Sequence, residues 1–300
     1  MRRSFLISAG LIVCGACAAA PALPQQAPSV ARLSIPTYEA IAPLHLTASK
    51  VREYTAPEAR QGVAVDATHF YAVVNNVIAK YDKLTGERIA YWFSPRGGLI
   101  RHINSCIENA GKLWCANSNF PETPMASSVE VIDTADMTHS ESRSLGILDE
   151  GSLTFFESYK DGWLAGFAHY DGEGGLTYKD GRFAGVVTYD AQWRRTGGWM
   201  LPNSVLERMA PHAASGGALG PDGYLYMLGH DRPEMYVLAR PTMGPKLIHI
   251  ATIDIDVAGQ AFSWDRSAPR TVYAINRPTG TVRVFTIPDV ATSDADAHPF

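Results

Sequence analysis

The chain has 300 residues, of which 46% are hydrophobic, 10% aromatic and 19% charged. This composition supports a large apolar core and excludes a disordered or tail-like protein. The formal net charge is −4 and there is no basic block, so nucleic acid is not an expected partner. The 26 glycines and 19 prolines favour short strands and many turns over helical bundles.

The first 23 residues have the pattern of an export signal. Arg2 and Arg3 give a positive start, residues 5–13 are mostly apolar, and residues 16–22 offer small-residue cleavage sites. The apolar run is too short for a stable membrane-spanning helix, and no later segment is long and apolar enough to be a transmembrane segment. We therefore expect a periplasmic or secreted protein. Lipid attachment at Cys17 is the less well matched alternative.

Cys106 and Cys115 are the two cysteines that would remain after cleavage of this signal. They lie symmetrically about a turn at 109–112, so they would face each other across a two-stranded hairpin. An oxidising compartment permits a disulfide between them. Two buried free thiols are the alternative.

A pattern of four short strands recurs from about residue 60. The first strand of each repeat starts after a small or polar pair, near residues 62, 104, 152, 216 and 260. Repeats of about 40–45 residues with four short strands each are typical of a β-propeller. We therefore predict an all-β propeller of five four-stranded blades. A sixth blade hidden in residues 24–49 stays open, and an irregular β-sandwich is the other alternative.

The last repeat shows only three strands. Residues 50–54 are expected to supply the fourth and so to close the ring, which would remove exposed strand edges. The predicted organisation is then a signal peptide (1–23), an N-terminal extension (24–49), the propeller (50–288) and a flexible C-terminal tail (289–300). Two insertions, at 170–182 and 201–214, are expected to be functional loops, and residues 204–207 fit a capping box that starts one short helix.

Strand direction predicts which polar residues converge. In a propeller, residues just before the innermost strand of a blade share a face with residues just after its second strand. The candidates for acid–base catalysis on this face are His102, Glu150, His169 and His230. The candidates for substrate binding are Gln61, Asn75, Arg101, Asn117, Tyr170, His212, Asp231, Asn276 and Arg277.

Oxygen ligands for one divalent metal, calcium or zinc, are also available at Glu150, Asn117 and Asn276. Each of these assignments has a structural alternative. Asparagine at a strand end commonly caps a turn, and a single histidine is often a packed or exposed residue without a ligand. The chain contains no Gly-x-Ser-x-Gly, His-Glu-x-x-His, phosphate-loop or dinucleotide-binding motif.

Residues 61–66 and 221–226 resemble the strand-turn phrases of gluconolactonase-like propellers. The resemblance covers most of residues 60–287, but only as short generic phrases. It implies a calcium held by glutamate, asparagine and aspartate, for which Glu150, Asn117 and Asn276 are the matching positions, and a carboxylate that assists lactone chemistry. The count of five blades departs from that family, and so do the histidines at matching blade positions, His169 and His230.

The resulting hypothesis is an exported enzyme, either a lactonase-like hydrolase or an isomerase/lyase. It would act on a small-molecule substrate, such as a lactone or cyclic acid, at the mouth of the central channel. The alternative is a non-enzymatic propeller that binds a ligand or a protein on the same face.

Overall fold

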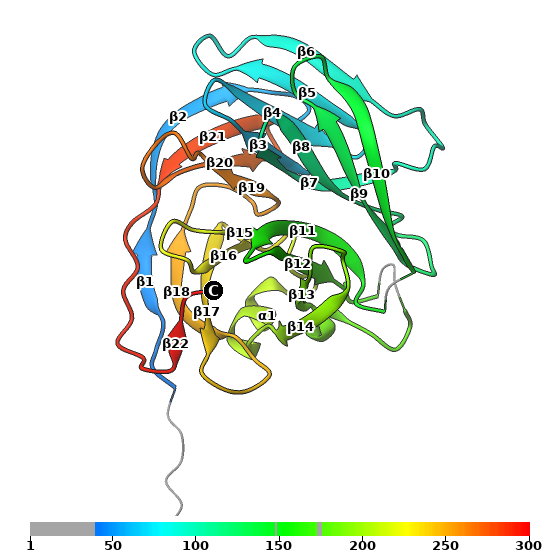
Figure 1. The fold of residues 1–300 in the computed structure, drawn as a ribbon. Coiled ribbons are helices and arrows are strands. Elements are labelled where there is room, and N and C mark those ends of the chain that lie inside the picture. The colour runs from blue at the N-terminus through cyan, green and yellow to red at the C-terminus, as the bar shows by residue number, and fades with distance from the viewer. Residues whose placement is uncertain (1–39, 148, 173–175) are drawn as a thin grey trace, which may run out of the picture. The chain divides into compact units, whose positions relative to one another are not determined.

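The computed structural model describes residues 40–147, 149–172 and 176–300. The predicted signal peptide and residues 24–39 of the predicted extension therefore lie outside the described residues. The described strands form five sheets, arranged as the blades of a β-propeller (Figure 1). The prediction of an all-β fold with five four-stranded blades is confirmed.

The first three blades follow the order of the chain, and each is an antiparallel sheet. Blade 1 consists of β3 (Gly62–Val65), β4 (His69–Val74), β5 (Val77–Asp82) and β6 (Arg88–Phe93). Blade 2 consists of β7 (His102–Asn109), β8 (Lys112–Ser118), β9 (Ala126–Asp133) and β10 (Thr138–Ile147). Blade 3 consists of β11 (Ser152–Tyr159), β12 (Gly162–Ala168), β13 (Gly185–Tyr189) and β14 (Arg195–Met200).

The last two blades recruit strands from both ends of the described chain. Blade 4 consists of β15 (Gly216–Leu219), β16 (Leu225–Leu228), β17 (Glu234–Pro241) and β18 (Ile248–Asp254), joined by β1 (Leu44–Thr47) and β22 (Ala297–His298). Blade 5 consists of β19 (Phe262–Trp264), β20 (Thr271–Asn276), β21 (Thr281–Thr286) and β2 (Ser49–Thr55). Strand β2 contains residues 50–54 and pairs antiparallel with β21.

The innermost strands contact one another in the cyclic order β3, β7, β11, β15, β19 and again β3. Residues 44–47 form β1, which runs parallel to β18 and belongs to blade 4. The described part of the chain therefore holds five blades, and the described residues of the 24–49 segment add no sixth.

Packing between blades depends on large side chains set against glycine. The ring of Phe155 on β11 is 1% exposed. A Cβ on Gly166 of the neighbouring strand, or on Gly217 of the next blade, would collide with this ring. The two glycines therefore make the room that lets β15 approach β11, because protein interiors are close-packed and leave no slack for an added atom.

The hairpin of β7 and β8 carries the disulfide. Cys106 and Cys115 are directly opposite each other in the register, and their sulfur atoms are bonded. The predicted disulfide is confirmed. It forms because the two cysteines are equally distant from the turn, which places both side chains on one face of the hairpin.

Two expectations about the peripheral segments need correction. The expected flexible tail is docked instead: β22 pairs with β17, Val290 and Ala297 are buried, and the ring of Phe300 packs on Trp199. Helix α1 (Asn203–Met209) exists, but it begins after Pro202 without a side-chain cap. The capping box fails because the helix already begins at Asn203, so Ser204 lies inside it, where its hydroxyl bonds the ring of His249.

The two ends of the central channel differ. We name the end where the innermost strands begin the start face, and the opposite end the end face. At the start face the strands crowd together: the Ala261 N–H donates to the Gln61 carbonyl at 3.1 Å, and a Cβ on Gly62 would lie 2.8 Å from the Ala261 Cβ. At the end face, all five innermost strands line a pocket of about 730 Å³.

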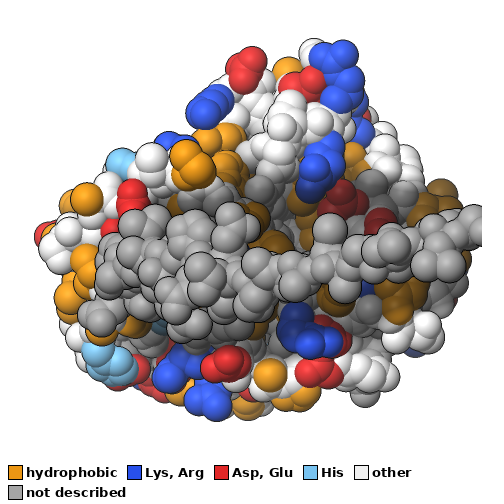
Figure 2. All heavy atoms as spheres, turned by 90° about the horizontal axis from the view of Figure 1, so that it is seen from below, with side chains coloured by type: hydrophobic (Ala, Val, Ile, Leu, Met, Phe, Trp, Pro, Cys, Tyr) orange, Lys and Arg blue, Asp and Glu red, His pale blue; other side chains and the backbone are white. Residues whose placement is uncertain are grey.

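One short 3-10 helix, η1 (Gly181–Phe183), precedes β13. Among the described residues, no helix combines the length and the apolar character needed to cross a membrane. On the face seen in Figure 2, positive and negative side chains are interspersed among apolar and polar ones.

Candidate functional site

Two histidines share one carboxylate at the start face. His212 precedes β15, and His230 and Asp231 directly follow β16. The Nδ1 atoms of His212 and His230 lie 2.6 Å from the Oδ2 and Oδ1 atoms of Asp231, respectively. The two imidazole rings stack with 4.0 Å between their centroids. We name these three residues the His–Asp cluster.

Arg277 fixes the protonation state of His230. Its guanidinium lies 2.8 Å from the Nε2 atom of His230. Because arginine can only donate, Nε2 must accept, so the proton of the neutral ring is on Nδ1 and is donated to Asp231. The lone pair on this outer nitrogen faces the Arg277 guanidinium, so His230 can act as a general base only when Arg277 moves away from it.

The surroundings keep His230 neutral and Asp231 ionised. Burial lowers the pKa of His230, and the nearby His212 and Arg277 lower it further against the opposing effect of Asp231. Burial alone would raise the pKa of Asp231, but the hydrogen bonds from His230 and His212 outweigh it and leave that pKa below its usual value.

Aromatic rings extend the cluster toward blade 2. The Tyr170 ring meets the ring of His212 edge-on at 4.9 Å and that of Phe120 at 5.4 Å. Phe120 in turn lies 5.4 Å from the ring of His102. The Tyr170 hydroxyl is 3.2 Å from the Ser215 hydroxyl, which fixes the orientation of the ring. The structure thus brings residues of blades 2 to 5 together on one face.

His102 is held neutral by this environment. Burial lowers its pKa to about 4, and the charge of Arg277 contributes in the same direction. An unfolded chain would bind this proton near pH 6.5. The neutral ring therefore favours the folded state fully above about pH 6.5, and this contribution is lost as the pH falls toward 4.

We expect this loss to be measurable with His102→Gln. Between pH 7.5 and pH 5, the free energy of unfolding of the wild type should fall by about 1–2 kcal/mol more than that of the variant, after allowance for the partial exposure of the ring. Urea titrations at both pH values provide the measurement. Parallel pH curves for the two proteins would contradict the neutral, buried state of His102.

The ring of His169 lies near Gly151 and Phe183 and has no polar partner among the described residues. It is 4% exposed, and neither ring nitrogen makes a hydrogen bond. Burial lowers its pKa, so the ring is held neutral. A Cβ on Gly151 would lie 2.8 Å from its Nε2 atom, which shows how tightly the backbone encloses the ring. Its role in catalysis stays a prediction.

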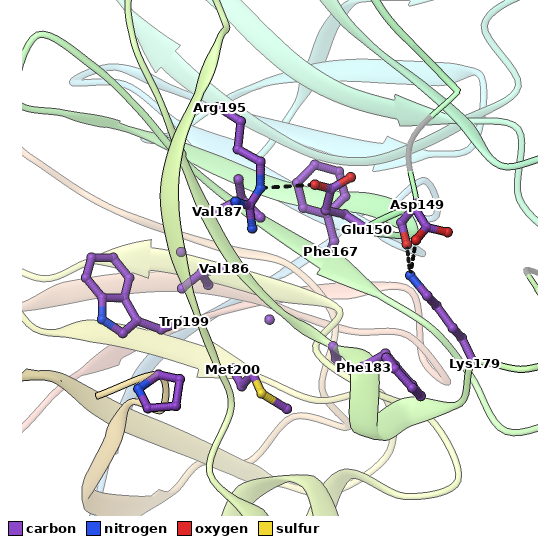
Figure 3. Close-up of a pocket in the computed structure, with 14 residues that line it drawn as sticks. Asp149, Glu150, Phe167, Lys179, Phe183, Val186, Val187, Arg195, Trp199 and Met200 are labelled. Carbon is purple, nitrogen blue, oxygen red and sulfur yellow. Dashed lines mark hydrogen bonds and ion pairs between the residues drawn. The ribbon is translucent and has the colours of Figure 1, made fainter. Parts of the chain in front are cut away.

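Glu150 does not join the His–Asp cluster. Its carboxylate lies 3.2 Å from the Arg195 guanidinium in a pocket of about 340 Å³, where Asp149 pairs with Lys179 (Figure 3). The walls of this pocket are apolar, as Figure 3 shows for Phe167 and Trp199 among others. The pocket is a separate ionic and apolar recess on blade 3.

The asparagines mostly hold backbone or neighbouring side chains. The Asn117 amide oxygen accepts from the backbone N–H groups of Arg101 and His102, both at 3.1 Å. Asn75 accepts from the Gln61 amide at 3.0 Å, and the Asn276 amide oxygen accepts from the Arg283 guanidinium at 2.9 Å. These contacts favour the structural interpretation, in which the amides cap strand ends.

Arg101 likewise has a partner of its own. Its guanidinium lies 2.6 Å from the Glu122 carboxylate, and it also donates to the Gly98 carbonyl at 3.0 Å. Arg277 is therefore the guanidinium that stands beside the histidines, whereas Arg101 pairs with a carboxylate at the rim.

The His–Asp cluster could also hold a metal ion. His212, His230 and Asp231 each offer one ligand atom, and these atoms lie within 4.8 Å of one another. Two imidazoles and a carboxylate suit zinc better than calcium, which prefers oxygen ligands. The positive charge of Arg277 beside Nε2 opposes a cation at that atom. Glu150, Asn117 and Asn276, the metal ligands predicted from the sequence, each bond another group of the protein. Their role as ligands stays a prediction.

Sequence reasoning missed the end-face pocket. Its most unusual residue is Glu157, which is 8% exposed although it is an acid. A signal was present in the sequence, because Glu157 interrupts the apolar run of β11. Glu157 lies inside a strand and at the opposite end of the channel from the strand ends that predict the start face.

Comparisons with known proteins leave the family open. No protein-family model matches the chain, and no curated protein matches it. Among solved structures, a mitotic checkpoint complex chain is similar with 10% identity and a TM-score of 0.46, covering 87% of this chain and 99% of that one. The hydrazine synthase of Kuenenia stuttgartiensis has 13% identity and a TM-score of 0.44, covering 75% of this chain and 71% of that one.

A Bacteroides caccae protein of unknown function is also similar, with 10% identity and a TM-score of 0.39, covering 67% of this chain and 61% of that one. These values are too low to carry a functional argument. The propeller is established by the sheets of the chain itself, and the gluconolactonase-like resemblance receives no support.

Proposed function

We propose that the start face is the active site of an enzyme that acts on a small polar substrate, such as a lactone or a cyclic acid. The observation that carries this proposal is the sharing of one carboxylate by two stacked imidazoles. This arrangement orients both rings and stabilises the positive charge that either gains on taking a proton. Arg277 adds a guanidinium suited to a substrate carboxylate.

In a hydrolytic reaction, the roles follow from this geometry. The Nε2 atom of His212, or that of His230 once Arg277 turns to the substrate, takes a proton from water as the water oxygen attacks the lactone carbonyl. The ring C–O bond then breaks, and the leaving oxygen receives the proton back from the imidazolium. The product carries a new carboxylate, which Arg277 would bind. An isomerase or lyase would use the same base to remove a proton from carbon.

A substrate screen tests the proposal. Wild-type protein would be assayed against five- and six-membered lactones and simple esters, and the double variant His212→Ala/His230→Ala is expected to lose turnover without unfolding. The matched control is His45→Ala, because His45 also pairs with an aspartate, Asp254, at 2.9 Å but is exposed. Turnover unchanged in the double variant would refute the proposal. Binding without turnover would favour a non-enzymatic propeller.

The metal content of the purified protein separates two versions of this site. A metal held by the His–Asp cluster would occupy the imidazole lone pairs and supply an activated water instead of a free base. Elemental analysis of protein prepared without chelators is the measurement. A stoichiometric metal that disappears in the double variant would replace the free-base version with the metal-assisted one.

We also propose that the protein is exported. The signal-like residues 1–23 and the Cys106–Cys115 disulfide support this, because structural disulfides persist in oxidising compartments. N-terminal analysis of the protein from a periplasmic or extracellular fraction should find a chain that starts near residue 24. Full-length chain retained in the reducing cytoplasm would contradict export.

A further inference from the structure

The end-face pocket is a second site at the other end of the channel. Its volume is about 730 Å³, within the range of pockets that hold small molecules. Each of the five innermost strands contributes to its lining, including Val65, Ile107, Leu219 and Trp264. These side chains give part of the lining an apolar surface, and polar residues such as Asn109, Ser158 and Ser263 form the rest.

Glu157 supplies a buried acid to this pocket. The residue is 8% exposed, and its carboxyl makes no hydrogen bond within the described part of the chain. The nearest cation is the guanidinium of Arg266 at 3.7 Å, on a side chain that is 66% exposed. Burial raises the pKa of Glu157 to about 7, since Arg266 offsets only part of the cost of removing the charge from water.

Two further acids share the lining. The Glu108 carboxylate accepts a hydrogen bond from the Gly111 N–H at 2.7 Å, and the Asp66 carboxylate accepts one from the Tyr71 hydroxyl at 2.6 Å. Both are fixed in place by these bonds, and for Asp66 the hydrogen bonds outweigh the effect of burial and hold the pKa below its usual value. Asp66, Glu108, Glu157 and Arg266 are the charged residues in the lining, so three acids stand against one exposed cation.

We propose that this pocket binds a small organic cation, a primary alkylamine, with its ammonium group against Glu157 and its chain along the apolar part of the lining. An ammonium supplies a second positive charge together with the hydrogen-bond donors that the buried carboxyl lacks, since Arg266 stays at 3.7 Å. The alkyl chain matches the apolar part of the lining, which water would solvate poorly. The site is separate from the His–Asp cluster and does not depend on the function proposed there.

Titration calorimetry with butylamine tests the proposal, with butanol as the uncharged ligand of the same shape. Butylamine should bind with one-to-one stoichiometry, at least about tenfold more tightly than butanol. Glu157→Gln keeps the side-chain shape and removes a buried charge, so it is expected to fold and to weaken butylamine binding at least about tenfold. Glu141→Gln, an exposed acid on β10, is the matched control and should bind as the wild type does.

Proton release gives an independent readout. At pH 7 the bound ammonium should ionise Glu157, so binding should release protons that calorimetry in buffers of different ionisation heat detects. This release should be absent in Glu157→Gln and unchanged in His212→Ala/His230→Ala. The proposal is overturned by an absence of binding up to about 10 mM butylamine, by equal affinity for butanol, or by unchanged binding in Glu157→Gln.

Discussion

Asp231→Asn is expected to lower kcat/KM on the substrate found in the lactone screen by about 10²–10⁴-fold. Asparagine has one acceptor oxygen and one NH2 group, so it can accept from only one of the two Nδ1 atoms that now donate to Asp231. The other imidazole must change tautomer or turn. Neither ring would then have a negative charge beside it when it takes a proton.

The pH profile distinguishes this role from a general loss of structure. Asp231 raises the pKa of His230, so its removal should move the acid limb of the kcat/KM profile to lower pH. Asp254→Asn is the matched control, because Asp254 holds the exposed His45 in a similar pair. An Asp231→Asn enzyme with normal kcat/KM, or with the same profile at a reduced level, would contradict the orienting role.

Phe155→Ala is expected to have the largest effect on stability. The ring is 1% exposed and fills the space between blade 3 and blade 4 that Gly166 and Gly217 leave open. Truncation removes its burial and leaves a cavity that the flanking strands cannot close, so the free energy of unfolding should fall by about 3–5 kcal/mol. Urea or guanidinium titration is the measurement.

Phe93→Ala is the control for this loss. Phe93 has the same side chain but is 59% exposed on β6, the outer strand of blade 1. Its truncation should change the free energy of unfolding by less than about 0.5 kcal/mol. Equal effects of the two substitutions would mean that packing between blades 3 and 4 does not depend on the Phe155 ring.

The blades were predictable because their signals are local. Each hairpin shows its apolar strands and its turn within about 20 residues, and a repeated signal is easier to detect than a single one. The disulfide was predictable for the same reason, since Cys106 and Cys115 flank one turn. The tail was not, because the pairing of Arg240 with His298 joins segments far apart in the chain.

For the candidate site, only the face of the propeller on which its residues lie could be predicted from the sequence. Strand direction places His212, His230 and Asp231 together, but it does not show that one carboxylate joins both rings. The identity of a residue also leaves its partner open. An asparagine that caps a strand end and one that binds a ligand look alike in a sequence, and Asn117 turns out to hold two backbone N–H groups.

The difference between the channel ends lay beyond sequence reasoning. It depends on how the five innermost strands approach one another, which is a property of the whole ring. Gly62 shows this close approach at the start face, where its neighbour Gln61 accepts from Ala261 across the closure between blades 1 and 5. Glu157 lines the open pocket at the end face, and no local sequence signal predicts that this end is open.

The composition of blade 5 also sets an order of events during synthesis. Its outer strand β2 leaves the ribosome early, whereas its partner β21 follows more than 200 residues later. Blades 1 to 3 can pair their strands as they emerge, but the ring cannot close before residue 286 is available. Until then β2 lacks its partner, so a chain interrupted before β21 would expose an unpaired strand edge at its N-terminal side.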